Sequence, residues 1–332
     1  MAKTTLNKET KSKPVLYLVV PCFNEEEVID KSAAILLDKE KRLIKEKVIS
    51  NKSKVLFVND GSKDKTRDKL IDLANNNSDY AVVNFSANYG HQSAIFAGMM
   101  VAKDYADIVV TIDADLQQDI EALDKFIEKY NEGCDVVYGV RNDRNTDGFF
   151  KKFTASLYYK MMHFMGCKII ANSADYRLLS KKALNALAEY KESNLFLRGL
   201  IPTMGFNSDI VYFDVKEREA GSSKYTLSKM INLAIDGITS FSAAPLHMIF
   251  ILGIVIVVLS VIMILITFVE YLQGKNVPGY STLLIVLLIS TGFIMLSLGV
   301  VGEYIGKIYS ETKNRPRYII DSVILKDKKN EK

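Results

Sequence analysis

The stretch IVVTIDADLQQD, residues Ile108 to Asp119, joins a run of apolar residues to a cluster of acidic and amide side chains. In an extended segment alternate side chains share a face, so we expect Asp113, Asp115 and Gln117 to converge on one point. Two carboxylates that close repel each other unless a cation lies between them. Mg²⁺ and Mn²⁺ prefer oxygen ligands, and Mg²⁺ is usually held by one or two carboxylates together with substrate phosphates. The stretch therefore predicts a buried strand that ends beside a metal and diphosphate site.

Four further apolar runs lie in the first half of the chain, and most are separated by charged, helix-like segments. Strands that alternate with helices predict an α/β fold with a mainly parallel sheet covered on both faces. Ligands bind beyond the carboxyl ends of such strands, and polar residues follow every run, so the pattern indicates one site. The runs are Val15–Val20, Lys54–Val58, Ala81–Phe85, Ile108–Ile112 and Asp135–Tyr138, followed by PCFNEE, NDGSKDKT, NYGHQ, DADLQQD and GVRND.

Two long apolar segments near the C-terminus predict two transmembrane helices. They cover residues 245–271 and 281–305 and carry charged residues only near their C-terminal ends. Each exceeds the roughly 20 apolar residues that a bilayer-spanning helix needs. The loop between them carries one lysine, whereas several basic residues follow the second segment. By the positive-inside rule both termini and the large domain are cytoplasmic, which predicts a multi-pass protein of the inner (cytoplasmic) membrane.

The composition excludes several other classes of protein. A net charge of +4 on 332 residues is too small to predict nucleic-acid binding. Basic tails at 1–13 and 306–332 suit an anionic membrane surface better. Three cysteines without close spacing argue against a disulfide framework and against a zinc site. Because the N-terminal residues are polar and basic, no signal peptide is expected there.

Two amphipathic segments complete the domain organisation. Residues 149–165 and 225–244 contain apolar residues at spacings of three and four, so each predicts a helix with one apolar stripe. Because a membrane segment follows, we expect helices that lie on the membrane surface. For residues 149–165, a helix that covers the sheet is an equally good interpretation. The large domain is predicted to span residues 14–224, including the helix at about 149–165.

The polar strand ends also have purely structural interpretations. Asp119 is expected to cap a helix, and Gly61 is expected in a tight turn with Ser62 or Asp64 capping the next helix. His91, within NYGHQ, is interpreted as a hydrogen-bonded polar residue rather than a catalyst. A D-x-D pair alone is a weak indicator of metal binding, but five polar strand ends together favour a binding site.

Taken in order, the motifs PCFNEEE, VNDGSKDKT, NYGHQSAIFAGM, DADLQQD, SADYRLLS and REAGSSKYTLSKMI resemble family 2 glycosyltransferases of the polyprenyl-phosphate branch. Relatives in that branch include dolichol-phosphate mannosyltransferase and, because of the two trailing apolar segments, the bacterial bactoprenol glucosyltransferases. The resemblance runs from about Val15 to the second apolar segment. It implies a GT-A fold, a nucleotide-sugar donor, Mg²⁺ or Mn²⁺ as cofactor, and inversion at the sugar carbon.

The resemblance also implies roles for individual residues. Asp175 corresponds to a carboxylate that acts near the acceptor, either as a base or by orienting the acceptor, since a phosphate monoester is largely dianionic at neutral pH. The sequence departs from the family pattern at Phe23, Asn59 and Ile120, where Tyr, Asp and Pro are usual, so details of nucleotide binding are expected to differ. The implied nucleotide-sugar-binding residues are Pro21, Phe23, Glu25, Val58, Asp60, Asp113, Ala114 and Asp115; the metal-binding residues are Asp115, Gln117 and Asp113; the catalytic residues are Asp175, Asp115 and Arg141; and the lipid-phosphate-binding residues are Arg218, Ser223 and Lys224.

The expected reaction is transfer of a hexose from a nucleotide sugar, UDP-glucose by this likeness, to undecaprenyl phosphate. UDP-N-acetylglucosamine is the alternative donor. A processive polysaccharide synthase is disfavoured because its acceptor motif needs a tryptophan and this chain has none. A catalytically silent membrane scaffold that binds nucleotide sugars remains a second class of interpretation. The resemblance further implies a homo-oligomer, such as a tetramer, and a downstream flippase and glycosyltransferase that use the product.

Overall fold

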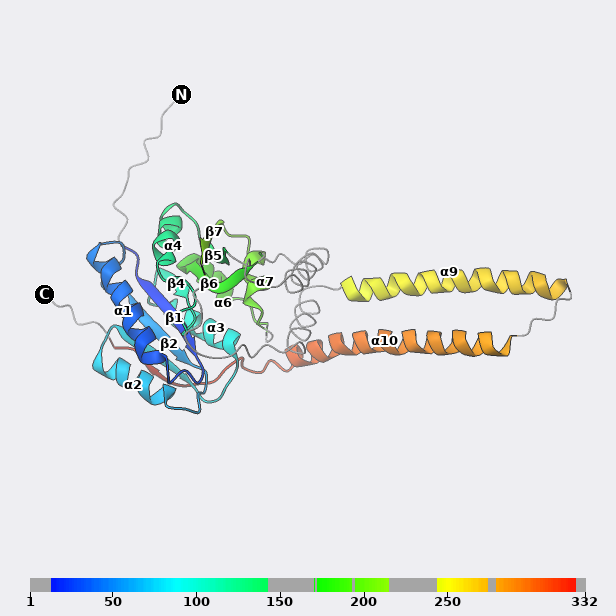
Figure 1. Ribbon diagram of the computed structural model, residues 1–332, viewed down its shortest axis with the longest axis horizontal. Helices are drawn as coiled ribbons and strands as arrows, with labels where there is room; N and C mark the ends of the chain where they lie inside the picture. Colours follow the sequence, from blue (N-terminus) through cyan, green and yellow to red (C-terminus); the bar gives the residue numbers. More distant parts are fainter. Residues whose placement is uncertain are drawn as a thin grey trace, which may run out of the picture. The chain divides into compact units, whose positions relative to one another are not determined.

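The computed structural model describes residues 13–142, 170, 172–192, 195–214, 244–273 and 279–326. The chain divides into two compact units, which Figure 1 labels by element. One is an α/β unit that also contains the C-terminal residues from Pro316 onward, and the other contains two long helices. The predicted interfacial helices at 149–165 and 225–244 lie outside the described residues, except for Ala244, which begins the first of the two long helices.

An eight-stranded sheet forms the centre of the α/β unit, in the order β7-β5-β6-β4-β1-β2-β3-β8. The central strands β4, β1, β2 and β3 run parallel to one another, so their carboxyl ends meet at one edge. The five strands that the apolar runs predict are all present. They are β1 (Leu16–Cys22), β2 (Lys54–Asn59), β3 (Tyr80–Phe85), β4 (Ile108–Thr111) and β5 (Val136–Arg141).

Three strands were not expected from the apolar runs. The motif SADYRLLS forms β6 (Ser173–Ser180), which is inserted antiparallel between β4 and β5. On the far side of β5 lies β7 (Ser208–Phe213). The third, β8 (Ile320–Ile324), pairs antiparallel with β3. The interpretation of residues 306–332 as a plain basic tail is therefore wrong for this segment, which completes the sheet.

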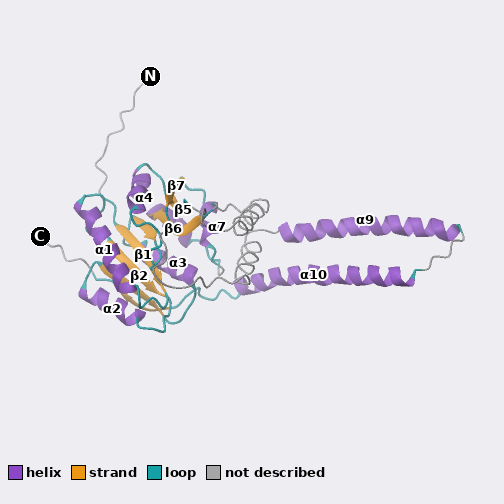
Figure 2. Cartoon of the chain, viewed as in Figure 1, coloured by secondary structure: helices purple, strands orange, loops and turns teal. Residues whose placement is uncertain are grey.

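Helices cover both faces of the sheet, as Figure 2 shows. Leucine, isoleucine and phenylalanine side chains of α1 (Ile29–Lys45), α2 (Thr66–Asn76) and α4 (Ala122–Asn131) are buried against one face in the main apolar core. On the other face α3 (His91–Ala102) packs so closely that a Cβ on Gly98 would lie 2.9 Å from a methyl group of Val58. Two shorter helices, α6 (Lys181–Ala188) and α7 (Leu197–Thr203), follow β6.

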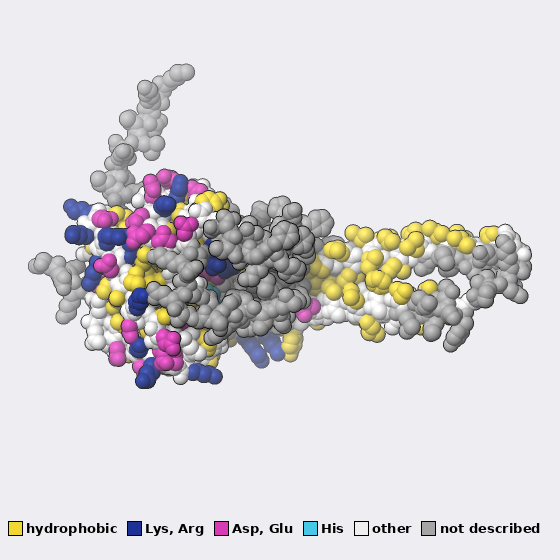
Figure 3. All heavy atoms as spheres, viewed as in Figure 1, with side chains coloured by type: hydrophobic (Ala, Val, Ile, Leu, Met, Phe, Trp, Pro, Cys, Tyr) yellow, Lys and Arg dark blue, Asp and Glu magenta, His cyan; other side chains and the backbone are white. Residues whose placement is uncertain are grey.

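The second unit contains α9 (Ala244–Leu272) and α10 (Tyr280–Thr312), which contact each other as a hairpin. Both helices present apolar side chains outward, and Figure 3 shows these side chains along them. Among the described residues, the segment Ile289–Thr312 is long and apolar enough to cross a membrane, and none of it is buried. Apolar side chains that have no protein to pack against need an apolar solvent, so the hairpin indicates membrane association.

Candidate functional site

The loops after β1 and β2 hold each other at the carboxyl edge of the sheet. The backbone nitrogen of Lys63 donates to the Asn24 side chain (2.8 Å), and the nitrogen of Asn24 donates to the Ser62 hydroxyl (3.0 Å). The nitrogen of Glu25 donates to the Thr66 hydroxyl (2.8 Å). Ser62 therefore ties the two loops together rather than capping the next helix. These hydrogen bonds join the loops PCFNEE and NDGSKDKT along one side of the candidate site.

Asp60 joins the loop after β2 to the loop after β3. Its buried carboxylate accepts hydrogen bonds from the backbone nitrogens of Tyr89 (2.7 Å) and Gly90 (3.0 Å) and from the side-chain amide of Asn88 (3.0 Å). Burial raises the pKa of the Asp60 carboxyl, although the two backbone donors act in the opposite direction. Asp60 thus shapes the NYGHQ loop, and its predicted contact with the nucleotide stays a prediction.

Gly61 is required where these two loops meet. Its φ of +63° lies in the left-handed region, and a Cβ there would lie 2.5 Å from the backbone nitrogen of Asn88. Gly61→Ala is therefore expected to destabilise the protein by more than the roughly 1–2 kcal/mol that a left-handed conformation alone costs. Gly205→Ala is the matched control, because Gly205 has a φ of +69° and nothing near its Cβ position.

Thermal unfolding of the two alanine variants measures the difference. The Gly61→Ala variant should melt at a clearly lower temperature than the Gly205→Ala variant. Equal melting temperatures would show that the close approach of the two loops adds nothing to the loss of stability caused by a Cβ at Gly61.

The acidic segment DADLQQD forms a turn. Because β4 ends at Thr111, the extended alternation that the sequence suggested does not apply to Asp113, Asp115 and Gln117. Gln118 is buried and holds Asp113 from both sides: its side-chain oxygen accepts from the Asp113 backbone nitrogen (2.9 Å), and its amide donates to the Asp113 carboxylate. The Asp115 carboxylate is exposed and accepts from the nitrogen of Gln117 (3.2 Å). A turn, not a strand, therefore presents the two aspartates.

The electrostatics of this turn fit a divalent cation. Burial raises the pKa of the Asp113 carboxyl, and the neighbouring carboxylates of Asp175 and Asp115 raise it further, while His91 lowers it. A cation would relieve this repulsion. Within the described residues no group of three or more His, Cys, Asp and Glu side chains is arranged to hold a metal. Mg²⁺ needs only one or two carboxylates when phosphates supply the other ligands, so the turn fits the ion in that form.

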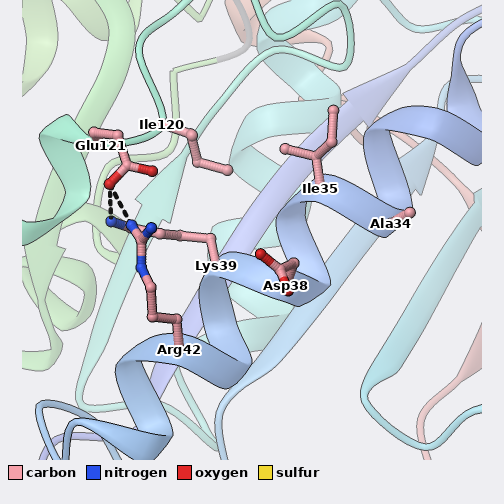
Figure 4. Close-up of a pocket in the computed structure, with 7 residues that line it drawn as sticks. All are labelled: Ala34, Ile35, Asp38, Lys39, Arg42, Ile120 and Glu121. Carbon is pink, nitrogen blue, oxygen red and sulfur yellow. Dashed lines mark hydrogen bonds and ion pairs between the residues drawn. The ribbon is translucent and has the colours of Figure 1, made fainter.

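The far end of the turn is fixed by ion pairs to α1, shown in Figure 4. Lys39, only 2% exposed, binds the carboxylates of Glu121 (2.9 Å) and Asp124 (2.6 Å), and Arg42 also binds Glu121. Ile120, which stands where proline is usual in the family, lines a hollow of about 330 Å³ beside these pairs. The ion pairs orient the start of α4 and hold the acidic turn against the sheet.

A second charged cluster is centred on Asp175 of β6. Arg198 of α7 donates from Nε to Oδ1 (3.2 Å) and from Nη2 to Oδ2 (2.9 Å). Arg177 donates to Oδ1 (2.5 Å), and the amide of Gln92 donates to Oδ2 (3.2 Å). Burial alone would raise the pKa of the Asp175 carboxyl, but Arg198 and Arg177 together hold this pKa well below its ordinary value. The ionised form of Asp175 is thus favoured by the two guanidinium groups that bind it.

His91 connects the two clusters. Its Nε2 atom lies 3.5 Å from Oδ1 of Asp113 and 3.7 Å from Oδ2 of Asp175. The sequence interpretation of His91 as a hydrogen-bonded polar residue agrees with these contacts, but it did not indicate that His91 lies between two carboxylates. His91 follows a predicted strand at the edge where the other polar loops meet, and this place in the sequence could have indicated its position in the site. By contrast, nothing in the sequence marked Arg198, which comes from a different helix.

The other predicted residues are placed as follows. At the site edge, Phe23 is 41% exposed, as a base-stacking residue must be, and Arg141 is exposed at the end of β5. Asn59, which replaces the usual aspartate, donates to the side chain of Asn84 (3.1 Å). Ser32 donates to the carbonyl of Ala114 (2.6 Å) and so fixes the backbone of the turn. Pro21, Val58 and Ala114 are buried, Glu25 is partly exposed, and Arg218, Ser223 and Lys224 lie outside the described residues.

The chain is similar to known proteins over most of its length. Residues 17–188 match the family described as glycosyl transferase family 2, and residues 244–308 match the GtrB C-terminal hairpin. Glycosyltransferase YkoT of Bacillus subtilis is 46% identical, covering 93% of this chain and 92% of its own. The bactoprenol glucosyl transferase of Shigella phage SfX is 39% identical, covering 92% of this chain and 98% of its own. A structure of glucosyl-3-phosphoglycerate synthase from Mycobacterium tuberculosis, in complex with Mn²⁺, UDP-glucose and phosphoglyceric acid, aligns at 16% identity and a TM-score of 0.43 over 68% of this chain and 78% of its own.

The family match covers the strands and loops that build the site, and the hairpin match covers the two apolar helices. The protein is therefore a glycosyltransferase of family 2 with a GT-A-like α/β domain and the C-terminal hairpin found in GtrB.

Proposed function

We propose that the protein transfers glucose from UDP-glucose to undecaprenyl phosphate, with inversion at the sugar carbon. The observation that carries this proposal is the pairing of an acidic turn, Asp113 and Asp115, with the arginine-rich cluster around Asp175, linked by His91 in one site. One cluster suits the diphosphate of a sugar donor, and the other offers positive charge for a second phosphate. Relatives named bactoprenol glucosyl transferase support glucose and this lipid.

The residues of the site suit the charges of this reaction. Breaking a sugar diphosphate bond leaves negative charge on the departing nucleotide, and Arg141 at the edge of the site would contact its phosphates. Mg²⁺ or Mn²⁺ held by Asp113, Asp115 and Gln117 would supply further stabilisation of that charge. The acceptor phosphate is largely dianionic at neutral pH and is already a nucleophile. The residues therefore need mainly to orient two phosphates and exclude water.

The hairpin explains why such an enzyme would be attached to a membrane. A polyprenyl chain stays in the bilayer, so an enzyme at the surface needs to meet only the phosphate. We propose that the domain and both termini face the cytoplasm, since basic residues follow the second helix. A homo-oligomer, and a flippase and glycosyltransferase that consume the product, are further parts of this proposal.

The proposal is tested by transfer from labelled UDP- and GDP-sugars to undecaprenyl phosphate in detergent, with Mg²⁺ or Mn²⁺ and with a chelator. A glycolipid from UDP-glucose that disappears with the chelator is the expected result. A product from UDP-N-acetylglucosamine alone would replace the sugar in the proposal. Nucleotide binding without any product would favour the silent scaffold instead.

Lys224→Ala separates the two substrates. We propose that Arg218, Ser223 and Lys224 hold the lipid phosphate, so removing the ammonium group should raise the KM for undecaprenyl phosphate at least several-fold while the Kd for UDP stays unchanged. Initial rates at varied lipid and calorimetry with UDP measure the two quantities. An equal loss of both would contradict a lipid-specific role.

A further inference from the structure

Asp175 has little capacity left to accept a proton. Each of its carboxylate oxygens accepts two hydrogen bonds: Oδ1 from Arg177 and Arg198, and Oδ2 from Arg198 and Gln92. The side chain is 7% exposed, and the two arginines favour its ionised form. A general base needs an accessible lone pair and a pKa near the working pH. The geometry of Asp175 is that of an anchor for cations.

The two arginines of the cluster differ in what they can reach. Arg177 is 1% exposed, and among the described residues its Nη2 atom binds Asp175 while its Nε and Nη1 atoms have no hydrogen-bond partner, so a ligand cannot reach this guanidinium. Arg198 also binds Asp175, but 37% of its side chain is exposed. Of the two guanidinium groups that bind Asp175, that of Arg198 is therefore the one that a ligand can reach.

The position of that guanidinium is supported from two elements, β6 and α3. Asp175 holds it from β6 through two parallel hydrogen bonds, the geometry in which an arginine fork is most rigid. Gln92 of α3 binds both Asp175 and the backbone nitrogen of Leu197, the residue before Arg198 (3.3 Å). Gln92 thereby couples the start of α7 to the carboxylate. An arginine held in this way is preorganised for a ligand.

We propose that Arg198 binds a phosphate oxygen of a substrate, and that Asp175 is a positioning residue that orients Arg198 rather than a base. The proposal rests on the proposed function, which requires two phosphate groups in this site. Guanidinium is the side chain best matched to phosphate, and His91 brings the cluster next to the acidic turn where the donor diphosphate is expected. The bound oxygen belongs to the donor diphosphate or to the lipid phosphate.

Arg198→Ala, Arg198→Lys and the exposed-lysine control Lys182→Ala are compared in the full-length protein in detergent. Arg198→Ala should lower kcat/KM by roughly 10²–10³-fold, as removal of a charge-stabilising donor does elsewhere. Arg198→Lys should recover only part of this, because lysine keeps the charge and loses the fork. Guanidinium ion added to Arg198→Ala should restore activity, an effect that a purely structural arginine would not show. Lys182→Ala should behave like the wild type.

Two binding measurements identify the source of the phosphate. If the donor is bound, Arg198→Ala weakens calorimetric binding of UDP and of inorganic pyrophosphate; if the lipid is bound, it weakens binding of farnesyl phosphate and raises the KM for undecaprenyl phosphate. Unchanged binding of all three probes together with unchanged kcat/KM would overturn the proposal. Because the binding assays need no turnover, they decide the role of Arg198 even if the wild type transfers no sugar, an outcome that would reject only the proposed function.

The role of Asp175 is tested by non-additivity. If Asp175 acts through Arg198, the variant Asp175→Asn/Arg198→Ala is no less active than Arg198→Ala alone. A further loss of kcat in the double variant would restore Asp175 as a base. Asp175→Asn leaves the buried Arg177 without a counter-ion and can unfold the protein, so the same comparison is made with Arg177→Met added to both variants.

Discussion

Asp115→Asn is expected to lower the rate of sugar transfer by roughly 10²–10³-fold, as large an effect as we predict for Arg198→Ala. We propose that Asp115 is the exposed carboxylate that meets the metal and the departing diphosphate. Its side chain is exposed and its one hydrogen bond within the turn is to the nitrogen of Gln117, which an asparagine oxygen can also accept. The substitution should therefore leave stability within about 0.5 kcal/mol of the wild type.

Asp119→Asn is the matched control. Asp119 belongs to the same acidic segment and accepts a comparable hydrogen bond from the nitrogen of Glu121 (3.2 Å), but it lies beyond the turn, next to the start of α4. It should retain near wild-type activity. Titration with Mn²⁺ completes the test, since Asp115→Asn should need a higher metal concentration for half-maximal rate. Equal rates for the two variants would place the metal elsewhere.

Removal of the residues after Arg315 is expected to destabilise the α/β unit by roughly 3–5 kcal/mol, which for a unit of this size lowers the melting temperature by about 6–12 °C. The truncation deletes β8 and exposes the edge of β3, whose backbone groups would lose their partners. It also deletes Tyr318, which stacks on Phe85 with ring centroids 5.1 Å apart. Arg317 lies over the ring of Phe96 at 4.5 Å and binds the carbonyl oxygen of Tyr190.

The truncation should also impair the site. The Asn59 side chain donates to Asn84, which donates to Ser322 of β8 (3.2 Å), so the strand supports the residue that precedes Asp60. Loss of this support should weaken UDP binding in addition to stability.

A chain that ends after Lys326 is the control, because it retains β8 and the hydrogen bond from Lys54 to the Lys326 carbonyl (2.8 Å). The chain contains no tryptophan, so unfolding is best followed with a thiol-reactive dye. Cys22 is buried in β1 and becomes reactive only when the sheet opens. If both truncated proteins have the melting temperature of the wild type, β8 is dispensable for the fold.

Local pattern was enough to predict the core of this protein. The five apolar runs became strands and their polar ends became loops, because a parallel strand buried on both faces has a continuous apolar sequence and must end where its loop meets water. The apolar helices were equally predictable, since a bilayer span needs an unbroken apolar segment of known length. The motif set also predicted the family, which the comparisons confirm over residues 17–188.

Tertiary structure alone decided three features that matter for the chemistry. The insertion of β6 between β4 and β5 put Asp175 beside Gln92, which is 83 positions away, and beside Arg198 of α7. The return of the chain after α10 paired Ser322 with Asn84, 238 positions away. The acidic residues after β4 adopted a turn because Gln118 bonds Asp113 on both sides. Each feature depends on contacts between distant residues or on side-chain geometry. Hydrophobic periodicity along the sequence predicts neither the distant contacts nor the side-chain geometry.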